Sequence, residues 1–282
     1  MAETISDGQV VAVLRPFVRG CGPMLDALRE SDPMGLRARA ERADSADELA
    51  EVESGLREKL LDGLTSVRVP GTAAWAAMDV DQRTHWWVNR VGRFTALLAS
   101  IPGLGGALAD RLPVQDALGA AAQGLLVCAL AGEHGVLDLG DRVRLTAWVL
   151  FDRDVDPVIA AGKHAAHDES ATSVDYTAVD YAAAEDAATE QLTEELAESK
   201  KKHGRITLKA SIGTLWRLGR SLLAIVEELE KRPRGRFYHR AIGMLPVVGM
   251  AGDYLGERSG LKRVAKRAQQ WFGKQSELTA RT

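Results

Sequence analysis

The sequence predicts an all-α protein: a multi-helix bundle with a central apolar helical hairpin and a basic C-terminal amphipathic helix. Of its 282 residues, 46% are hydrophobic, which is enough to bury a sizeable core, and only 5% are aromatic. Alanine, leucine and glycine are plentiful while runs of β-branched residues are few, a composition that favours helices over strands. In several segments the apolar residues also recur three and four positions apart, which is the period of a helix with one buried face.

Residues 1–80 are predicted to form an N-terminal helical module. The first 45 residues contain three prolines, which weaken the helical pattern there: Pro16, Pro23 and Pro33. Ser45 and Glu48 then form a capping box, and it is followed at helical spacing by Leu49, Val52, Leu56 and Leu60. The sequence Val69-Pro70-Gly71 ends this pattern.

A second helix is predicted from about Asp81 to Ser100, and it begins the first part of a helical core that spans residues 81–151. Its apolar stripe consists of Trp87, Val91, Phe94 and Leu98. Three arginines lie off that stripe: Arg83, Arg90 and Arg93.

The apolar hairpin is predicted within residues 101–151. Pro102 and the glycines after it end the preceding helix, Asp116 caps an apolar helix that ends near Gly132, and Asp141 opens the next one. The longest uncharged run, residues 117–132, has 16 residues, whereas a bilayer-spanning helix needs about 20. A buried core helix is the simpler interpretation, and a helix that dips into a membrane is the alternative.

Residues 152–204 are predicted to be an acidic spacer inserted in the core. Between positions 152 and 199 there are 13 acidic residues and only two basic ones. The stretch 182–199 has good helix formers but little apolar stripe, so we expect at most a surface helix there. The alternative is an acidic cover that competes for a basic surface elsewhere in the chain.

The charge of the chain is strongly asymmetric. Residues 200–282 contain 19 Lys/Arg and 6 Asp/Glu, whereas residues 1–199 contain 17 and 33. Such asymmetry indicates an anionic partner for the basic part, either membrane headgroups or nucleic acid.

Two amphipathic helices are predicted in this basic part, within the second half of the core, residues 205–275. One covers about 212–229, and the closing one has an apolar face with Leu261, Val264, Trp271 and Phe272. The predicted anion-binding surface combines a basic stretch, the closing helix and its aromatic pair: Lys231, Arg232, Arg234, Arg236, Arg240, Arg258, Lys262, Arg263, Lys266, Arg267, Trp271 and Phe272. The alternative is that the apolar face packs inside the fold and the cations form a solvated rim.

Two blocks of the chain, Pro102 to Leu150 and Ala241 to Trp271, together form one pattern: an apolar helix, a Gly-Val turn and a second helix, then a Pro-Val-Val-Gly stretch and a closing helix. In this they resemble the bacterial EcsC family, whose members are membrane-associated helical proteins, and the small two-helix membrane domain that follows some bacterial GTPase domains. The resemblance covers about residues 94–153 and 205–273. It implies membrane proximity and supplies no catalytic residue.

No motif in the sequence indicates a reaction. There is no GxxxxGK[ST] and no G-x-S-x-G, and the Gly-rich stretch 103–106 follows no strand pattern. His164 and His167 have the spacing of two metal ligands on one helix face, but the polar segment around them favours a solvated role. Cys21 and Cys128 lie far apart in the sequence and have no zinc-finger or disulfide spacing. We therefore expect no catalytic, cofactor-binding or metal-binding residue.

These observations predict a non-enzymatic accessory or scaffold protein in the cytoplasm, bound peripherally to the inner face of an anionic membrane. The N-terminal sequence has no basic region followed by an apolar stretch, so no secretion signal is expected. The alternatives are a nucleic-acid-binding module that uses the same cations, and a soluble scaffold whose acidic segment recruits a protein partner.

Overall fold

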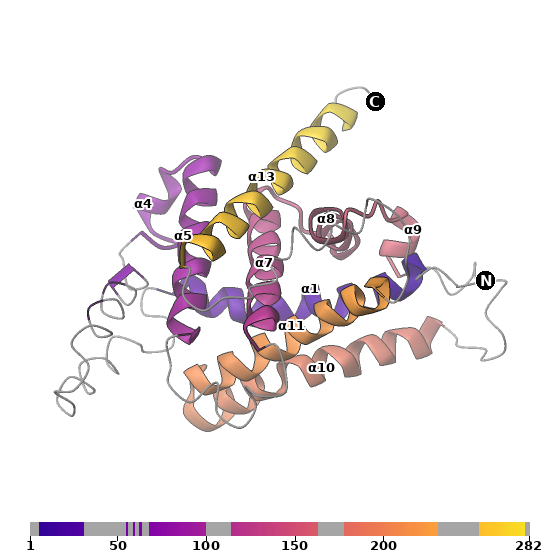
Figure 1. The fold of residues 1–282 in the computed structure, drawn as a ribbon, viewed down its shortest axis with the longest axis horizontal. Helices are drawn as coiled ribbons and strands as arrows, with labels where there is room; N and C mark the ends of the chain where they lie inside the picture. The colour runs from indigo at the N-terminus through magenta and orange to yellow at the C-terminus, as the bar shows by residue number, and fades with distance from the viewer. Residues whose placement is uncertain are drawn as a thin grey trace.

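Helices make up the whole regular structure of the described part of the chain. The computed structural model describes residues 6–30, 68–99, 114–162, 178–230 and 254–279, with isolated positions at 55, 59, 62 and 63, and among these residues there is no strand. The helices, shown in Figure 1, are α1 (Asp7–Arg29), α4 (Ala73–Ala76), α5 (Val80–Ala99), α7 (Val114–Glu133), α8 (Leu139–Phe151), α9 (Pro157–Ala160), α10 (Ala178–His203), α11 (Leu208–Glu230) and α13 (Tyr254–Thr279). The predicted all-α class is confirmed.

Helix α7 is the centre of the fold. It contacts α1, α5, α8, α11 and α13, and Figure 1 shows it in the middle of the bundle. Its residues from Ala117 to Ala131 are buried on every side, as expected for a helix that is apolar all round. The interpretation as a buried core helix therefore holds for α7 in this fold. In the described regions, none of the helices has both the length and the apolar character needed to cross a bilayer.

A tight turn joins α7 to α8. Val136 donates its N–H to the Ala131 carbonyl and Gly135 donates to that of Gly132, with Gly135 at a φ of 72°. This is a Schellman motif, and glycine suits it because the left-handed conformation is strained for other residues. The two helices touch, but Figure 1 shows α7 along its length and α8 end-on, so they cross. A side-by-side hairpin is not confirmed.

Helix α1 is built into the same core as the rest of the bundle. It contacts α7, α8, α9, α10 and α11, and seven of its side chains are completely buried: Val10, Val11, Leu14, Phe17, Cys21, Met24 and Leu28. A Cβ at Gly124 of α7 would overlap the ring of Phe17, so the missing side chain lets the two helices approach closely. The expected weakness around Pro16 and Pro23 is absent, because this burial outweighs the lost backbone hydrogen bonds. The buried residues of α1 belong to the same hydrophobic cluster as those of the other described helices.

The two cysteines, far apart in the sequence, meet inside this core. Cys21 of α1 and Cys128 of α7 are both free and buried. Burial raises the pKa of the Cys21 thiol well above its ordinary value, and a hydrogen bond with the Cys128 thiol adds to the effect. Both thiols therefore behave as small apolar groups that join α1 to α7.

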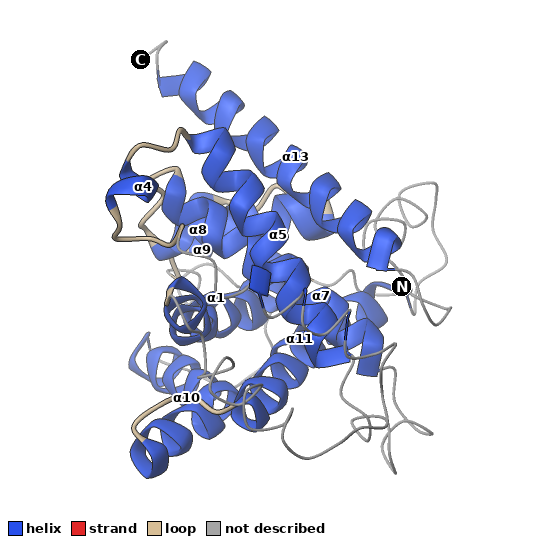
Figure 2. Ribbon diagram, turned by 90° about the vertical axis from the view of Figure 1, so that its left-hand side faces the viewer, coloured by secondary structure: helices blue, strands red, loops and turns tan. Residues whose placement is uncertain are grey.

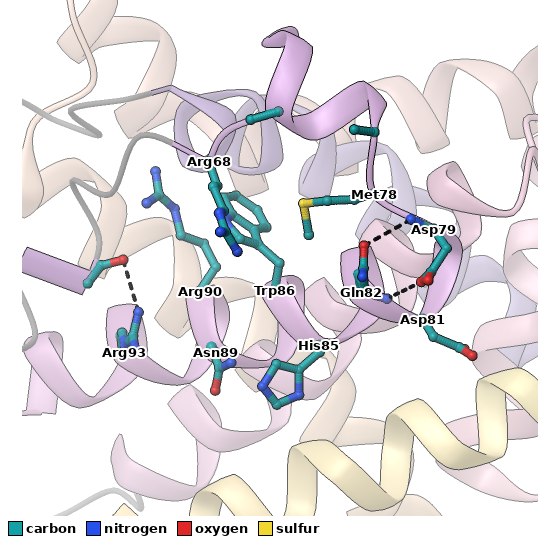
Figure 3. A pocket seen from close by; sticks show the side chains of 13 residues that line it. Arg68, Met78, Asp79, Asp81, Gln82, His85, Trp86, Asn89, Arg90 and Arg93 are labelled. Atoms are coloured by element: carbon teal, nitrogen blue, oxygen red, sulfur yellow. Dashed lines mark hydrogen bonds between the residues drawn. The ribbon is translucent and has the colours of Figure 1, made fainter.

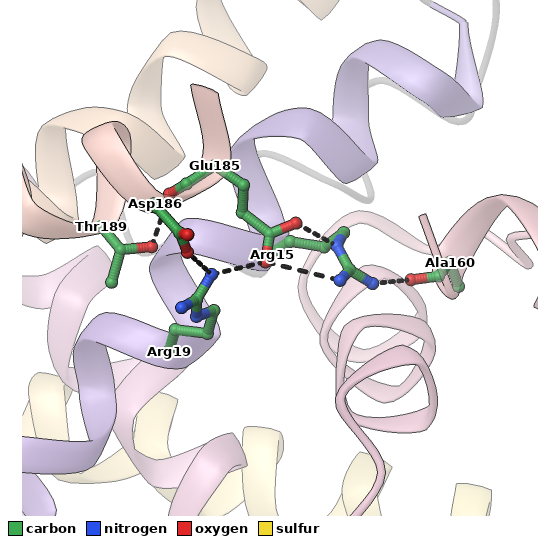
Figure 4. A network of polar contacts seen from close by, with 6 residues as sticks. All are labelled: Arg15, Arg19, Ala160, Glu185, Asp186 and Thr189. Atoms are coloured by element: carbon green, nitrogen blue, oxygen red, sulfur yellow. Dashed lines mark hydrogen bonds and ion pairs between the residues drawn. The ribbon is translucent and has the colours of Figure 1, made fainter. Parts of the chain in front are cut away.

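Over residues 178–203 the acidic segment forms α10, a surface helix that packs against α1 and α11. Figure 4 shows the contact: Glu185 accepts from Arg15 Nε at 2.5 Å and from Arg19 at 3.0 Å, and Asp186 pairs with Arg19 at 2.6 Å. The hydrogen bond with Asp186 raises the pKa of Arg19. Arg15 also donates to the Ala160 carbonyl of α9 at 2.8 Å. The sequence could not predict these contacts, because the partners of the α10 carboxylates lie about 170 residues earlier in the chain.

Candidate anion-binding surface on α13

The inner face of α13 docks onto α5, α7 and α8. Every side chain of the predicted apolar face is at most 8% exposed: Leu261, Val264, Ala265, Ala268, Trp271 and Phe272. Trp271 and Phe272 are thus core residues, with their rings 5.7 Å apart in an edge-to-face arrangement. In this fold they are not placed to enter a membrane. Of the two possibilities for the apolar stripe, the structure has the one in which it packs inside the protein.

The outer face of α13 carries cations that point away from the bundle. Lys262, Arg263 and Lys266 are exposed, and they lie within about one turn of one another. Because the opposite face is held in the core, these charges are presented on a fixed helix. They are the predicted site residues that the structure brings together on one surface.

Arg267 has a different role from the one predicted. Its guanidinium donates to the Asp152 carboxylate at 2.7 Å and to the Trp148 carbonyl at 2.6 Å, and its charged carbon lies 4.9 Å from the Trp148 ring centre. Lys274 approaches the same ring at 5.0 Å. Arg267 therefore fastens α13 to the end of α8, and its charge is neutralised within the protein.

Six other predicted cations are not placed by the structure. Arg258 belongs to α13, but its side chain lies outside the described part. Outside the described residues altogether are Lys231, Arg232, Arg234, Arg236 and Arg240.

A second basic surface lies at the turn between α10 and α11. Its six basic residues are all exposed: Lys200, Lys201, Lys202, His203, Arg205 and Lys209. The Ser199 hydroxyl closes this turn by accepting from the Thr207 N–H at 2.9 Å and donating to the Arg205 carbonyl at 3.0 Å. In both Figures 1 and 2, α13 lies on the upper side of the bundle and α10 with α11 on the lower side. The run of three lysines at positions 200–202 is the signal of this surface in the sequence.

His134 lies against α13, just beyond the end of α7. Its ring stacks on Phe272 with the centroids 3.8 Å apart, and its buried Nε2 has no hydrogen-bond partner among the described residues. Burial lowers the pKa of His134, although Asp81 and Glu133 act in the opposite direction. The helix dipole at the end of α7 would favour the charged ring, so burial outweighs it here.

The stability of the protein is therefore expected to fall as the pH falls from 7 through the ordinary histidine value of 6.5. As the pH falls, His134 takes up a proton in the unfolded chain first, because its pKa is lower in the folded state. The free energy of unfolding stops falling once the pH is below the pKa of His134 in the folded state. Urea unfolding at several pH values measures this. H134F keeps the stacking but cannot titrate, so its stability should depend less on pH in this window. Equal pH dependence in both proteins would contradict the assignment.

No metal centre is evident in the described regions, where no group of three or more His, Cys, Asp or Glu side chains is placed to hold an ion. His164 and His167 lie outside the described residues. Comparison of the chain with protein-family models, with curated proteins and with solved structures gives no significant match. The resemblance to the EcsC family therefore rests on the quoted sequence blocks alone.

Proposed function

We propose that this protein is a non-enzymatic accessory or scaffold protein that binds peripherally to the anionic inner face of a membrane. The observation that carries the proposal is the exposed group Lys262, Arg263 and Lys266 on a helix whose other face is fixed in the core. The resemblance to the EcsC family and the basic character of the last third of the chain point the same way.

The burial of the apolar face determines the mode of binding. With Trp271 and Phe272 in the core, no described part of α13 offers an apolar face for insertion. Binding is then electrostatic, between lysine and arginine side chains and lipid phosphates, and salt weakens such binding because it screens exposed charges. We therefore expect vesicle binding that is lost at high ionic strength.

The test is co-sedimentation of the full-length protein with neutral and with anionic vesicles, at low and high salt. Each cation near an anionic surface contributes about 1 kcal/mol, so the triple variant K262E/R263E/K266E should bind anionic vesicles at least about 100-fold more weakly. Neutral vesicles should bind neither protein. Thermal unfolding should be nearly unchanged, because the three side chains are exposed.

A matched control is available at the turn between α10 and α11. The variant K200E/K201E/K202E changes the charge by the same amount, but on the other side of the bundle, and a flat membrane meets only one side at a time. It should bind vesicles nearly as well as the wild type. If only this variant loses binding, the membrane contact lies at the turn between α10 and α11 and not on α13. If the wild type does not bind vesicles at all, the proposal is refuted. Duplex DNA added as a competitor tests the nucleic-acid alternative directly.

A further inference from the structure

A pocket of about 660 Å³ lies beside α4 and α5, and none of its lining residues belongs to α13 (Figure 3). One wall is a single face of α5 that includes His85, Trp86 and Asn89. The facing wall consists of Ala74, Ala77 and Met78, from α4 and the turn after it. Its volume is in the range of sites that hold a small organic molecule.

The wall of this pocket is held rigidly around Trp86. The Trp86 ring makes edge-to-face contacts with Trp75 and Trp87, each with centroids 4.9 Å apart. Arg90 lies 5.0 Å from the ring centre, and Arg90 itself is buried. An aromatic wall fixed in this way is already shaped before a ligand arrives, which lowers the entropic cost of binding.

One end of the pocket is basic. Arg68 is exposed there and makes no hydrogen bond or ion pair with the residues that the structure describes. Arg93 is oriented by a hydrogen bond from Nη1 to the Gly63 carbonyl at 3.1 Å, which leaves its charge without a carboxylate partner in the described regions. Figure 3 shows Arg68, Arg90 and Arg93 gathered on the same side. These guanidinium groups attract a carboxylate or phosphate.

The other end of the pocket has two carboxylates, and both are already engaged. Asp79 accepts the Gln82 N–H at 2.7 Å, as the cap of α5. Asp81 accepts from Gln269 of α13 at 3.0 Å. The two carboxylates are therefore held by the protein. Arg90 is bonded to the end of α1, so Arg68 and Arg93 are the cations of this pocket that a ligand would meet.

We propose that this pocket binds a small amphiphilic anion. Its carboxylate or phosphate lies at Arg68 and Arg93, and its apolar chain lies along Met78 and Trp86. Such an anion is either free in solution or a lipid taken from a membrane, because both carry the same groups. None of the residues of this site belongs to the cationic surface of α13. The proposed ligand site can therefore be refuted without refuting the proposed membrane contact, and the reverse also holds.

Isothermal titration of the full-length protein with decanoate and with decyl phosphate, kept below their micelle concentrations, tests the proposal. We expect saturable binding of one molecule per chain for both. The variant R68E should bind at least about tenfold more weakly, since a charge-assisted hydrogen bond is replaced by repulsion. R68E should fold normally because Arg68 is exposed, and A77W should also block binding by filling the pocket. K201E, which removes a distant cation, should bind as the wild type does.

Decanol and inorganic phosphate separate the two parts of the ligand. Each should bind more weakly than decanoate, because decanol lacks the charge and phosphate lacks the chain. For the lipid source, the protein is incubated with vesicles that contain radiolabelled phosphatidic acid and is then re-isolated by gel filtration. Label carried at one lipid per wild-type chain but not by R68E indicates a lipid, whereas binding of decanoate alone indicates a soluble anion. Absence of saturable binding of both anions, or equal affinity in R68E and wild type, would overturn the proposal.

Discussion

Replacement of Gly219 by alanine is expected to destabilise the protein by about 3 kcal/mol or more. Gly219 lies in α11, and a Cβ built there would overlap the backbone carbonyl of Ala117 in α7. The obstacle is main chain and cannot rotate away, so the methyl group would have to push the two helices apart. Since α7 is the centre of the bundle, the displacement would also disturb the packing of its other neighbours.

The measurement is the midpoint of thermal unfolding together with the free energy of unfolding from urea titration. A loss of about 3 kcal/mol corresponds to a midpoint lower by roughly 5–10 °C for a chain of this size. Two matched controls are G119A in α7 and G273A in α13, where none of the described residues lies within 4 Å of a Cβ. These should be neutral or stabilising, because alanine is the better helix former by about 1 kcal/mol. A G219A protein as stable as the wild type would show that α7 and α11 are not in backbone contact.

The helices with a clear apolar stripe were predictable from the sequence. The helix expected from about Asp81 to Ser100 is α5, and the one expected over 212–229 is α11, which begins four residues earlier at Leu208. In both, the stripe that defines the period is the face that packs on α7. Periodicity predicts such elements because the same burial that stabilises them produces the pattern.

The packing of α10 could not be predicted in this way. Its surface is mostly charged, and it is held to α1 by ion pairs from Arg15 and Arg19 to Glu185 and Asp186. Ion pairs between distant segments leave no periodic signal in either segment. Composition could therefore predict a surface helix here but not the helices on which it packs.

The positions of the cations on α13 were predictable from the sequence, but the environment of its apolar face was not. The helical period places Lys262 and Lys266 opposite the apolar face whatever that face contacts, and the structure agrees. An apolar stripe of this kind fits a protein core and a membrane equally well. The sequence therefore could not decide between them, and the structure was needed to show that the stripe is buried in the protein. The ion pair of Arg267 could not be predicted either, because its partner Asp152 lies 115 positions away in the sequence.

Replacement of Arg90 by methionine is expected to cost about 2–4 kcal/mol of stability. Arg90 was predicted to lie off the apolar stripe of its helix, yet it is only 1% exposed. Its guanidinium donates from Nε to the Leu28 carbonyl at 2.9 Å and from Nη2 to the Glu30 carbonyl. These carbonyls belong to the end of α1, where a helix has no donors of its own to offer. Arg90 thus acts as a cap for α1 that is supplied by α5.

The charge state of Arg90 decides what this variant measures. Burial lowers the pKa of Arg90 to about 10, and the nearby charge of Arg93 contributes. The side chain is therefore still protonated at pH 7, and R90M removes a charged donor from the Leu28 and Glu30 carbonyls while keeping most of the apolar stem. R90K keeps the charge but not the planar guanidinium that bonds both carbonyls. Its loss of unfolding free energy should therefore be smaller than that of R90M. R220M makes the same change at an exposed arginine of α11 and should alter the free energy of unfolding by less than about 0.5 kcal/mol. If R90M and R220M have equal effects in urea unfolding, then Arg90 is not the cap of α1.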